Sequence, residues 1–131
     1  MILVDTSVLI DFFKGFESEG SRKFQTVLQQ GMPFGINSFI FQEVLQGAAS
    51  EKEFSLLSKY LSTQRFYHLK DPVDSFANAA RLYMECRKKG ITLRSTIACL
   101  IAETVLEHDL ILLHHDNDFV AMAKVVPLKF F

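Results

Sequence analysis

The sequence predicts an α/β fold, an α/β/α sandwich with a central, mainly parallel β-sheet. Short apolar runs typical of buried strands alternate along the chain with longer segments that have the periodicity of amphipathic helices. Alternation of strands and helices is the usual pattern of a parallel sheet covered by helices. No linker or internal repeat divides the 131 residues, so they are expected to form a single domain, residues 1–131.

The first half of the chain is expected to contain two strands and four helices. The strands are residues 2–4 and the Phe-Gly-Ile run at 34–36. The helices are expected over 7–13, ending at Gly15; over 18–30, ending at Gly31; from Ser38 as cap to Gly47; and over 51–62.

The second half of the chain is expected to begin with a stretch, 65–69, that suits either a strand or a loop. Asp71 and Pro72 are typical of a helix start, and that helix is expected to run to Lys89 and stop at Gly90. The remaining elements are a helix over about 94–107, a strand over 110–115, a short helix over 117–123 and a strand over 126–130.

Composition limits the classes of function. The net charge is −1, so no global positive field attracts nucleic acid, and an RNA-binding surface must be local or shared with a second subunit. Cys86 and Cys99 are isolated, which is typical of buried thiols in a reducing compartment. Neither a signal peptide nor a membrane-spanning run is recognisable, so we expect a soluble cytoplasmic protein.

Four carboxylates follow predicted strands. Asp5 comes directly after the first strand, Glu43 lies in the helix after the second, and Asp116 and Asp118 follow the strand that begins at Leu110. Taken singly, Asp5 also suits a helix cap, Glu43 a surface position and Asp-Asn-Asp a turn. Because the carboxyl ends of parallel strands share one edge of the sheet, their common placement favours an acidic pocket.

An acidic pocket of this kind is expected to bind a divalent cation. Clustered carboxylates repel one another unless a cation is present, and hard oxygen ligands favour Mg²⁺ or Mn²⁺. The natural chemistry is metal-assisted hydrolysis of a phosphodiester. A phosphatase with Asp5 as its nucleophile is an alternative, but it needs a second acid two residues later, where the chain has Ser7.

Four motifs resemble the PIN domain, and more closely the VapC toxins of bacterial toxin–antitoxin pairs. They are ILVDTSVLIDFF (2–13), NSFIFQEVLQG (37–47), GITLRSTIACLIA (90–102) and LLHHDNDF (112–119). The resemblance implies a homodimeric endoribonuclease that depends on Mg²⁺ or Mn²⁺ and leaves a 5′-phosphate and a 3′-hydroxyl. It also implies a VapB-type antitoxin as partner and tRNA, including initiator tRNA, as substrate.

The resemblance also implies residue roles. The first, second and fourth acids of the family match Asp5, Glu43 and Asp116, with Asp118 close by as a further metal ligand. Thr6 and Ser7 match the hydroxyls that hold the first acid or a metal-bound water.

Position 98 departs from the family pattern. The third acid of the family falls where this chain has Ala98, between intact flanking motifs. An engineered replacement would make a toxic nuclease harmless enough to express; natural loss is the alternative. Either way we expect the chain to fold normally and to cleave weakly or not at all. A non-catalytic PIN-like module that binds RNA or protein is the second candidate function.

Basic residues near the end of the helix that stops at Gly90 are candidate phosphate contacts. We expect Arg81, Arg87, Lys88 and Arg94 to line an RNA-binding rim across a dimer groove. For Arg87 and Lys88, a solvated helix end that suits the helix dipole is the alternative interpretation.

Overall fold

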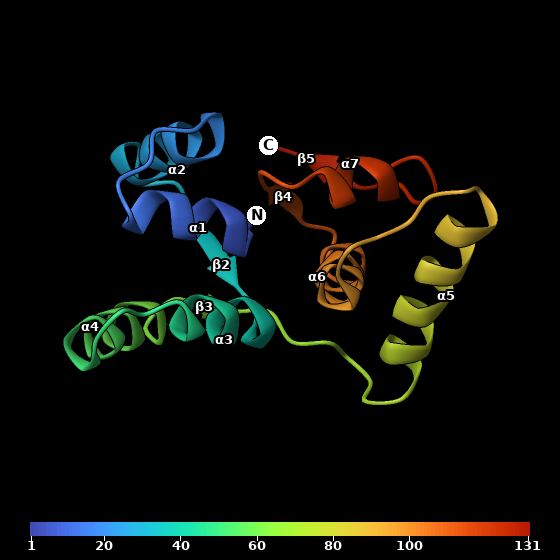
Figure 1. Ribbon diagram of the computed structural model, residues 1–131, viewed down its shortest axis with the longest axis horizontal. Coiled ribbons are helices and arrows are strands. Elements are labelled where there is room, and N and C mark those ends of the chain that lie inside the picture. Colours follow the sequence, from blue (N-terminus) through green and yellow to red (C-terminus); the bar gives the residue numbers. More distant parts are fainter.

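The computed structural model describes residues 1–131 and contains five strands and seven helices (Figure 1). The strands are β1 (Ile2–Val4), β2 (Phe34–Ile36), β3 (Arg65–Phe66), β4 (Ile111–Leu113) and β5 (Lys129–Phe130). The helices are α1 (Thr6–Phe13), α2 (Glu19–Gln29), α3 (Ser38–Gln46), α4 (Glu51–Leu61), α5 (Asp74–Lys88), α6 (Thr96–Glu107) and α7 (Asn117–Met122).

The strands form one sheet in the order β3-β2-β1-β4-β5, and every neighbouring pair is parallel. Leu3 of β1 pairs with Gly35 of β2 on one side and with Leu112 of β4 on the other. The expected α/β sandwich with a parallel sheet is therefore confirmed. The carboxyl ends of β1, β2 and β4 lie next to one another at one edge of this sheet.

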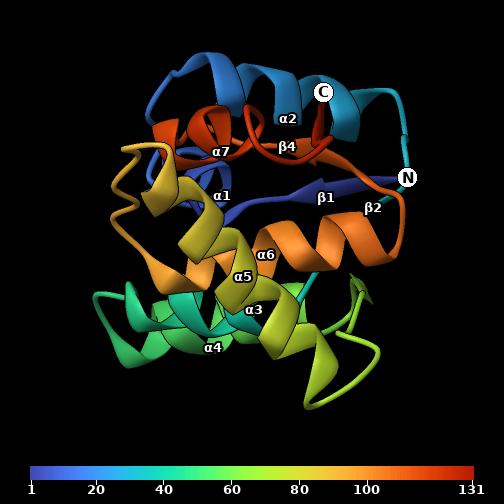
Figure 2. The ribbon, with the colours of Figure 1, turned by 90° about the vertical axis from the view of Figure 1, so that its right-hand side faces the viewer.

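Helices cover both faces of the sheet. α1 lies against one face with α2 beside it, and α6 lies on the other face with α5 packed outside it (Figures 1 and 2). α3 and α4 pack against each other, and α3 also contacts α1 and α6. The layers enclose one hydrophobic core, in which Leu3, Ile36 and Leu112 are fully buried. None of the helices combines the length and apolarity that a membrane crossing requires.

The start of α3 differs from the prediction. Asn37, not Ser38, is the N-cap, and its side-chain oxygen accepts a hydrogen bond of 2.9 Å from the Ile40 N–H. The Asn37 amide also donates to the Thr104 hydroxyl of α6 at 3.1 Å. Asn37 is therefore buried between two helices, which a capping rule based on local sequence does not reveal.

The start of α5 is also later than predicted. The Asp71 carboxylate accepts hydrogen bonds from the Val73 and Asp74 N–H groups, so it does cap this turn, but the helix itself begins at Asp74. At the other end, Gly90 has a φ of +76° and stops the helix as expected.

The outer strands of the sheet are short. Only two residues of the 65–69 stretch pair as β3. The strand expected over 126–130 is reduced to β5, since Pro127 has no N–H to donate to a neighbouring strand. The 110–115 strand ends at Leu113, where His114 and His115 turn toward α7.

Candidate active site

Three of the predicted acids line one cavity of about 210 Å³ at the carboxyl edge of the sheet. Asp5 comes from the end of β1, Glu43 from α3 and Asp116 from the connection between β4 and α7. Ala98 of α6 lines the same cavity. The structure thus brings together residues that are up to 111 positions apart in the chain.

Asp5 is held in place by its neighbours. Its side chain caps α1 by accepting hydrogen bonds from the N–H and the hydroxyl of Ser7, at 3.0 and 2.6 Å. The same hydroxyl accepts a 3.0 Å hydrogen bond from the His115 N–H. The Asp5 N–H donates to the Leu113 carbonyl at 2.9 Å, which extends the pairing of β1 and β4 by one residue. Ser7 therefore ties the first acid to the segment that carries the last.

The environment of Asp5 disfavours its charge. Burial raises the pKa of Asp5 to about 6 against the lowering effect of the Ser7 hydrogen bonds, and the charges of Asp116 and Glu43 raise it further. A cation in the cavity would offset both the burial and the repulsion.

Glu43 is held by Thr6. The Thr6 hydroxyl donates to one carboxylate oxygen of Glu43 at 2.7 Å. Thr6 is buried and Glu43 is half-buried. This contact orients the Glu43 side chain toward the cavity, so the Thr6 hydroxyl contacts the second acid, whereas the resemblance implied contact with the first acid or a metal-bound water.

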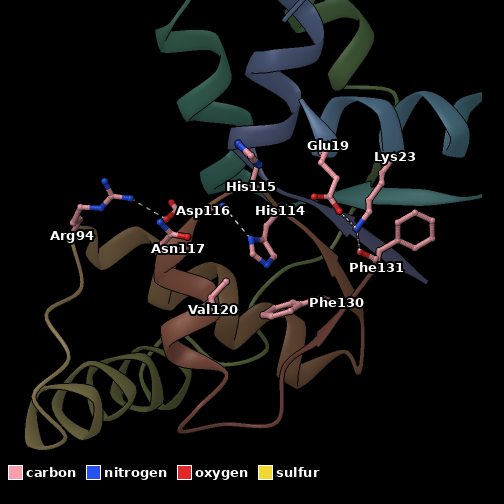
Figure 3. Close-up of a pocket in the computed structure, with 11 residues that line it drawn as sticks. Glu19, Lys23, Arg94, His114, His115, Asp116, Asn117, Val120, Phe130 and Phe131 are labelled. Carbon is pink, nitrogen blue, oxygen red and sulfur yellow. Dashed lines mark hydrogen bonds and ion pairs between the residues drawn. The ribbon is translucent and has the colours of Figure 1, made fainter. Parts of the chain in front are cut away.

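Asp116 lies at the boundary between the cavity and solvent. It caps α7 by accepting from the Asp118 N–H at 2.9 Å, and its Oδ1 lies 3.4 Å from a guanidinium nitrogen of Arg94. Figure 3 shows the Arg94 side chain reaching toward Asp116. The Arg94 side chain is 75% exposed, so this pair contributes little to stability.

Asp118 is not among the residues that line the cavity, in contrast to its predicted partner Asp116. It is buried, and its Oδ2 accepts hydrogen bonds from the Arg94 and Ser95 N–H groups at 2.9 and 3.3 Å. The helix predicted over about 94–107 begins at Thr96, and the two residues before it, Arg94 and Ser95, donate their N–H groups to Asp118 instead. Asp118 thus fixes the segment that leads into α6, the helix that carries Ala98.

Ala98 occupies the first turn of α6 and is 4% exposed. Because it lines the cavity with the three acids, a carboxylate at this position would add a fourth negative group to the same space. The third-acid role of position 98 that the resemblance implies stays a prediction.

The donor set fits a hard divalent cation. No group of three or more acidic, histidine or cysteine side chains is gathered tightly enough to hold a metal by itself. Mg²⁺, however, is usually held by one or two carboxylates and keeps several waters. A cavity of about 210 Å³ has room for such a hydrated ion, since a water occupies about 30 Å³.

The four candidate phosphate contacts do not all lie at this cavity. Arg94 reaches Asp116, whereas Lys88 pairs with Glu85 of its own helix at 3.5 Å. Arg87 lines a separate, mainly apolar cavity between α5 and α6, and Arg81 is exposed on α5.

His114 is a residue that sequence reasoning treated as structural only. Its Nδ1 accepts a 3.1 Å hydrogen bond from the Asp116 N–H, and burial lowers its pKa. Both the accepted hydrogen bond and the burial favour the neutral imidazole. His114 also lines a second cavity that contains Asp116 (Figure 3). Adjacent histidines at a strand end gave no signal that distinguished this position.

Curated relatives cover nearly the whole chain. Ribonuclease VapC11 of Mycobacterium tuberculosis and VapC ribonuclease Mb1587 of Mycobacterium bovis are each 28% identical to it over 130 residues. These alignments cover 98% of this chain and 96% of each relative.

Solved structures share the fold. VapBC-1 from nontypeable Haemophilus influenzae matches with a TM-score of 0.72 at 15% identity, over 100% of this chain and 97% of that one. VapBC2 from Rickettsia felis, bound to a promoter DNA fragment, matches with a TM-score of 0.70 at 18% identity, over 100% and 98% of the two chains. A model of the PIN domain matches residues 2–125. The chain belongs to the PIN domain family.

Proposed function

We propose that this protein is the toxin of a VapBC-type toxin–antitoxin pair, a VapC-like ribonuclease. The observation that carries the proposal is the cavity shared by Asp5, Glu43 and Asp116 in a PIN domain. The curated relatives are VapC ribonucleases over nearly their full length. A phosphatase is disfavoured because Ser7 stands where a second acid would be needed and is bound to Asp5.

The three acids would hold Mg²⁺ or Mn²⁺. When bound, such an ion stabilises charge on the phosphate during in-line displacement and activates the attacking water. Ser7 keeps the Asp5 carboxylate in place, and Thr6 does the same for Glu43. Asp118, although predicted as a ligand, is better suited to positioning, because Arg94 and Ser95 occupy its carboxylate.

Ala98 would leave the site one carboxylate short. The missing group removes one negative charge and one fixed oxygen ligand from the cavity, so metal binding and cleavage are both expected to be weakened. The fold does not depend on that carboxylate, because Ala98 packs as an ordinary buried residue of α6. We therefore propose a correctly folded toxin with impaired catalysis.

The proposed substrate is tRNA, with initiator tRNA as one candidate. Arg94 borders the acidic cavity and can offer its exposed guanidinium to a phosphate there. The helix before Arg94, α5, carries three more basic residues, Arg81, Arg87 and Lys88. They would add further phosphate contacts if RNA crosses a groove between two subunits. The near-zero net charge makes a local surface of this kind necessary.

The proposed partners are a VapB-type antitoxin and a second copy of the chain. Several structural neighbours are toxin–antitoxin complexes, including one from Klebsiella pneumoniae with a TM-score of 0.69 at 22% identity. The expected compartment is the cytoplasm, where tRNA is available.

The test is cleavage of a tRNA mixture by the Ala98→Asp variant. We expect Mg²⁺-dependent cleavage by this variant, little or none by the parent chain, and loss of cleavage in the Ala98→Asp/Asp5→Asn double variant. Absence of cleavage by Ala98→Asp, with RNA binding retained, would instead favour a non-catalytic RNA-binding PIN module. Phosphate release from a small monoester would favour the phosphatase.

A further inference from the structure

A second and larger cavity, of about 440 Å³, lies beside the acidic one (Figure 3). We propose that it binds the nucleobase of the nucleotide next to the phosphate that the acidic cavity receives. This inference rests on the proposed function and adds to it a site that would select the RNA sequence or conformation at the cleavage point. The volume lies within the range of about 300–1,000 Å³ that is usual for small-molecule sites.

The two cavities share a wall. Asp116 lines both, and Arg94 beside it belongs to the rim of the larger one. His115 of the larger cavity donates its N–H to the Ser7 hydroxyl, and this hydroxyl donates to Asp5 of the acidic cavity. An RNA strand with one phosphate at the acids would therefore have its neighbouring nucleoside at the larger cavity.

An exposed aromatic ring lies on the wall of the larger cavity. Phe130 of β5 is 40% exposed, although it is a large apolar side chain. The His114 ring packs against it edge-to-face, with centroids 4.4 Å apart and an interplanar angle of 67°. His114 is itself fixed by the Asp116 N–H at 3.1 Å. Phe130 is thus a braced ring that is open to the cavity, which suits base stacking.

Cations flank this aromatic surface. Lys23 of α2 lies on the same cavity, where its Nζ is 3.3 Å from Glu19 and 3.0 Å from the Phe131 carbonyl oxygen. Figure 3 shows Arg94 at one end of the cavity, next to Asp116, and Lys23 at the other end, next to Glu19 and Phe131. The cavity thus combines an exposed aromatic ring, on which a base can stack, with two cations, each paired with a carboxylate that a phosphate could replace.

Gly20 brings α2 close to this wall. A Cβ at position 20 would lie 2.9 Å from Val8 Cγ2 and 3.3 Å from the His115 Cβ. Only a residue without a side chain permits this approach, which places Lys23, one turn along α2, on the cavity.

The test uses the parent chain, short single-stranded RNAs and 2-aminopurine as a fluorescent base. A set of otherwise identical oligonucleotides carries the probe at one position each, and fluorescence is recorded on binding in Mg²⁺. We expect strong quenching at one position, recovery of fluorescence there in Phe130→Ala, and a rise in Kd of about 5- to 100-fold. Phe130→Trp is expected to restore the quenching.

Phe16→Ala is the matched control, because Phe16 is 63% exposed and does not line the cavity. It should leave both quenching and Kd unchanged. RNA binding with the same quenching in Phe130→Ala as in the parent, or equal loss of binding in Phe16→Ala, would overturn this inference alone. Complete absence of RNA binding by the parent would overturn it together with the proposed function.

Discussion

The Thr6 hydroxyl donates a 2.7 Å hydrogen bond to the Glu43 carboxylate and so joins two helices across 37 positions of sequence. Thr6 follows Asp5 directly, so one short segment carries the first acid and holds the second. α1 follows β1 and α3 follows β2, and because these neighbouring strands are parallel both helices begin at the same edge of the sheet. This contact makes the relative position of the two acids a property of the fold.

Removal of the Thr6 hydroxyl is expected to destabilise the protein. Thr6→Val keeps the shape but leaves the half-buried Glu43 oxygen without its donor, at a cost of about 1 kcal/mol. Thr6→Ser keeps the hydroxyl and is the control. Urea unfolding of the three proteins checks the prediction, and equal stabilities of Thr6→Val and Thr6→Ser would contradict it.

A carboxylate at position 98 is expected to destabilise the metal-free protein. It would be buried beside Asp5, Glu43 and Asp116 and would add to their repulsion. We expect Ala98→Asp to melt about 3–6 °C below the parent in EDTA at pH 8, with the difference narrowing in excess Mg²⁺. Ala98→Asn, which has the same shape without the charge, controls for steric effects. A clearly higher melting temperature for the metal-free aspartate form would show the repulsion argument to be wrong.

The charge of Asp5 is expected to make metal-free stability depend on pH. Its pKa is about 6 in the folded protein against an ordinary 3.8, a difference worth roughly 3 kcal/mol. The folded state holds the Asp5 proton more tightly than the unfolded state does. The resulting contribution to the free energy of unfolding is therefore fully present below pH 3.8 and is lost as the pH rises through 6. Asp5→Asn should therefore gain stability relative to the parent between pH 4 and pH 7. A difference in melting temperature between Asp5→Asn and the parent that stays constant from pH 4 to pH 7 would contradict the prediction.

A second pH effect is expected between α5 and α6. Burial, and a hydrogen bond to Glu107, raise the pKa of Glu103 to about 7 from 4.5. Glu103 accepts a 3.2 Å hydrogen bond from Asn78 of α5. As for Asp5, a raised pKa means that protonated Glu103 stabilises the folded state. This contribution to the free energy of unfolding is present below pH 4.5 and is lost as the pH rises through about 7.

Glu103→Gln keeps the acceptor for Asn78 and removes the charge. We expect its melting temperature to exceed that of the parent by a margin that grows from pH 5 to pH 8. A constant difference for Glu103→Gln over this range would count against a raised pKa.

The central strands and the positions of the acids could be predicted from the sequence, because each follows from a local pattern. Apolar runs at 2–4, 34–36 and 111–113 form the three central strands, and parallel pairing places the residues after each strand at one edge of the sheet. Asp5, Glu43 and Asp116 converge for this reason. Ala98 stands out only by the resemblance to the VapC motifs, since in an isolated helix it is an ordinary core residue.

Other features depend on tertiary contacts that local patterns do not encode. Asp118 has the same residue type and neighbourhood as Asp116, but the backbone N–H groups of Arg94 and Ser95 occupy its carboxylate. Asn37 replaces Ser38 as cap because its amide also reaches Thr104 on another helix. His114, which follows β4, and Phe130 of β5 form one wall of the larger cavity through their ring contact. No sequence pattern relates these two positions.

Divalent-ion binding tests the central claim most directly. Mn²⁺ titrations followed by electron paramagnetic resonance should give one site in Ala98→Asp, about 10- to 100-fold weaker binding in the parent, and a further loss in Asp5→Asn or Glu43→Gln. Equal Mn²⁺ affinity in the parent, Ala98→Asp and Asp5→Asn would show that the ion does not bind among these carboxylates, and would contradict the account.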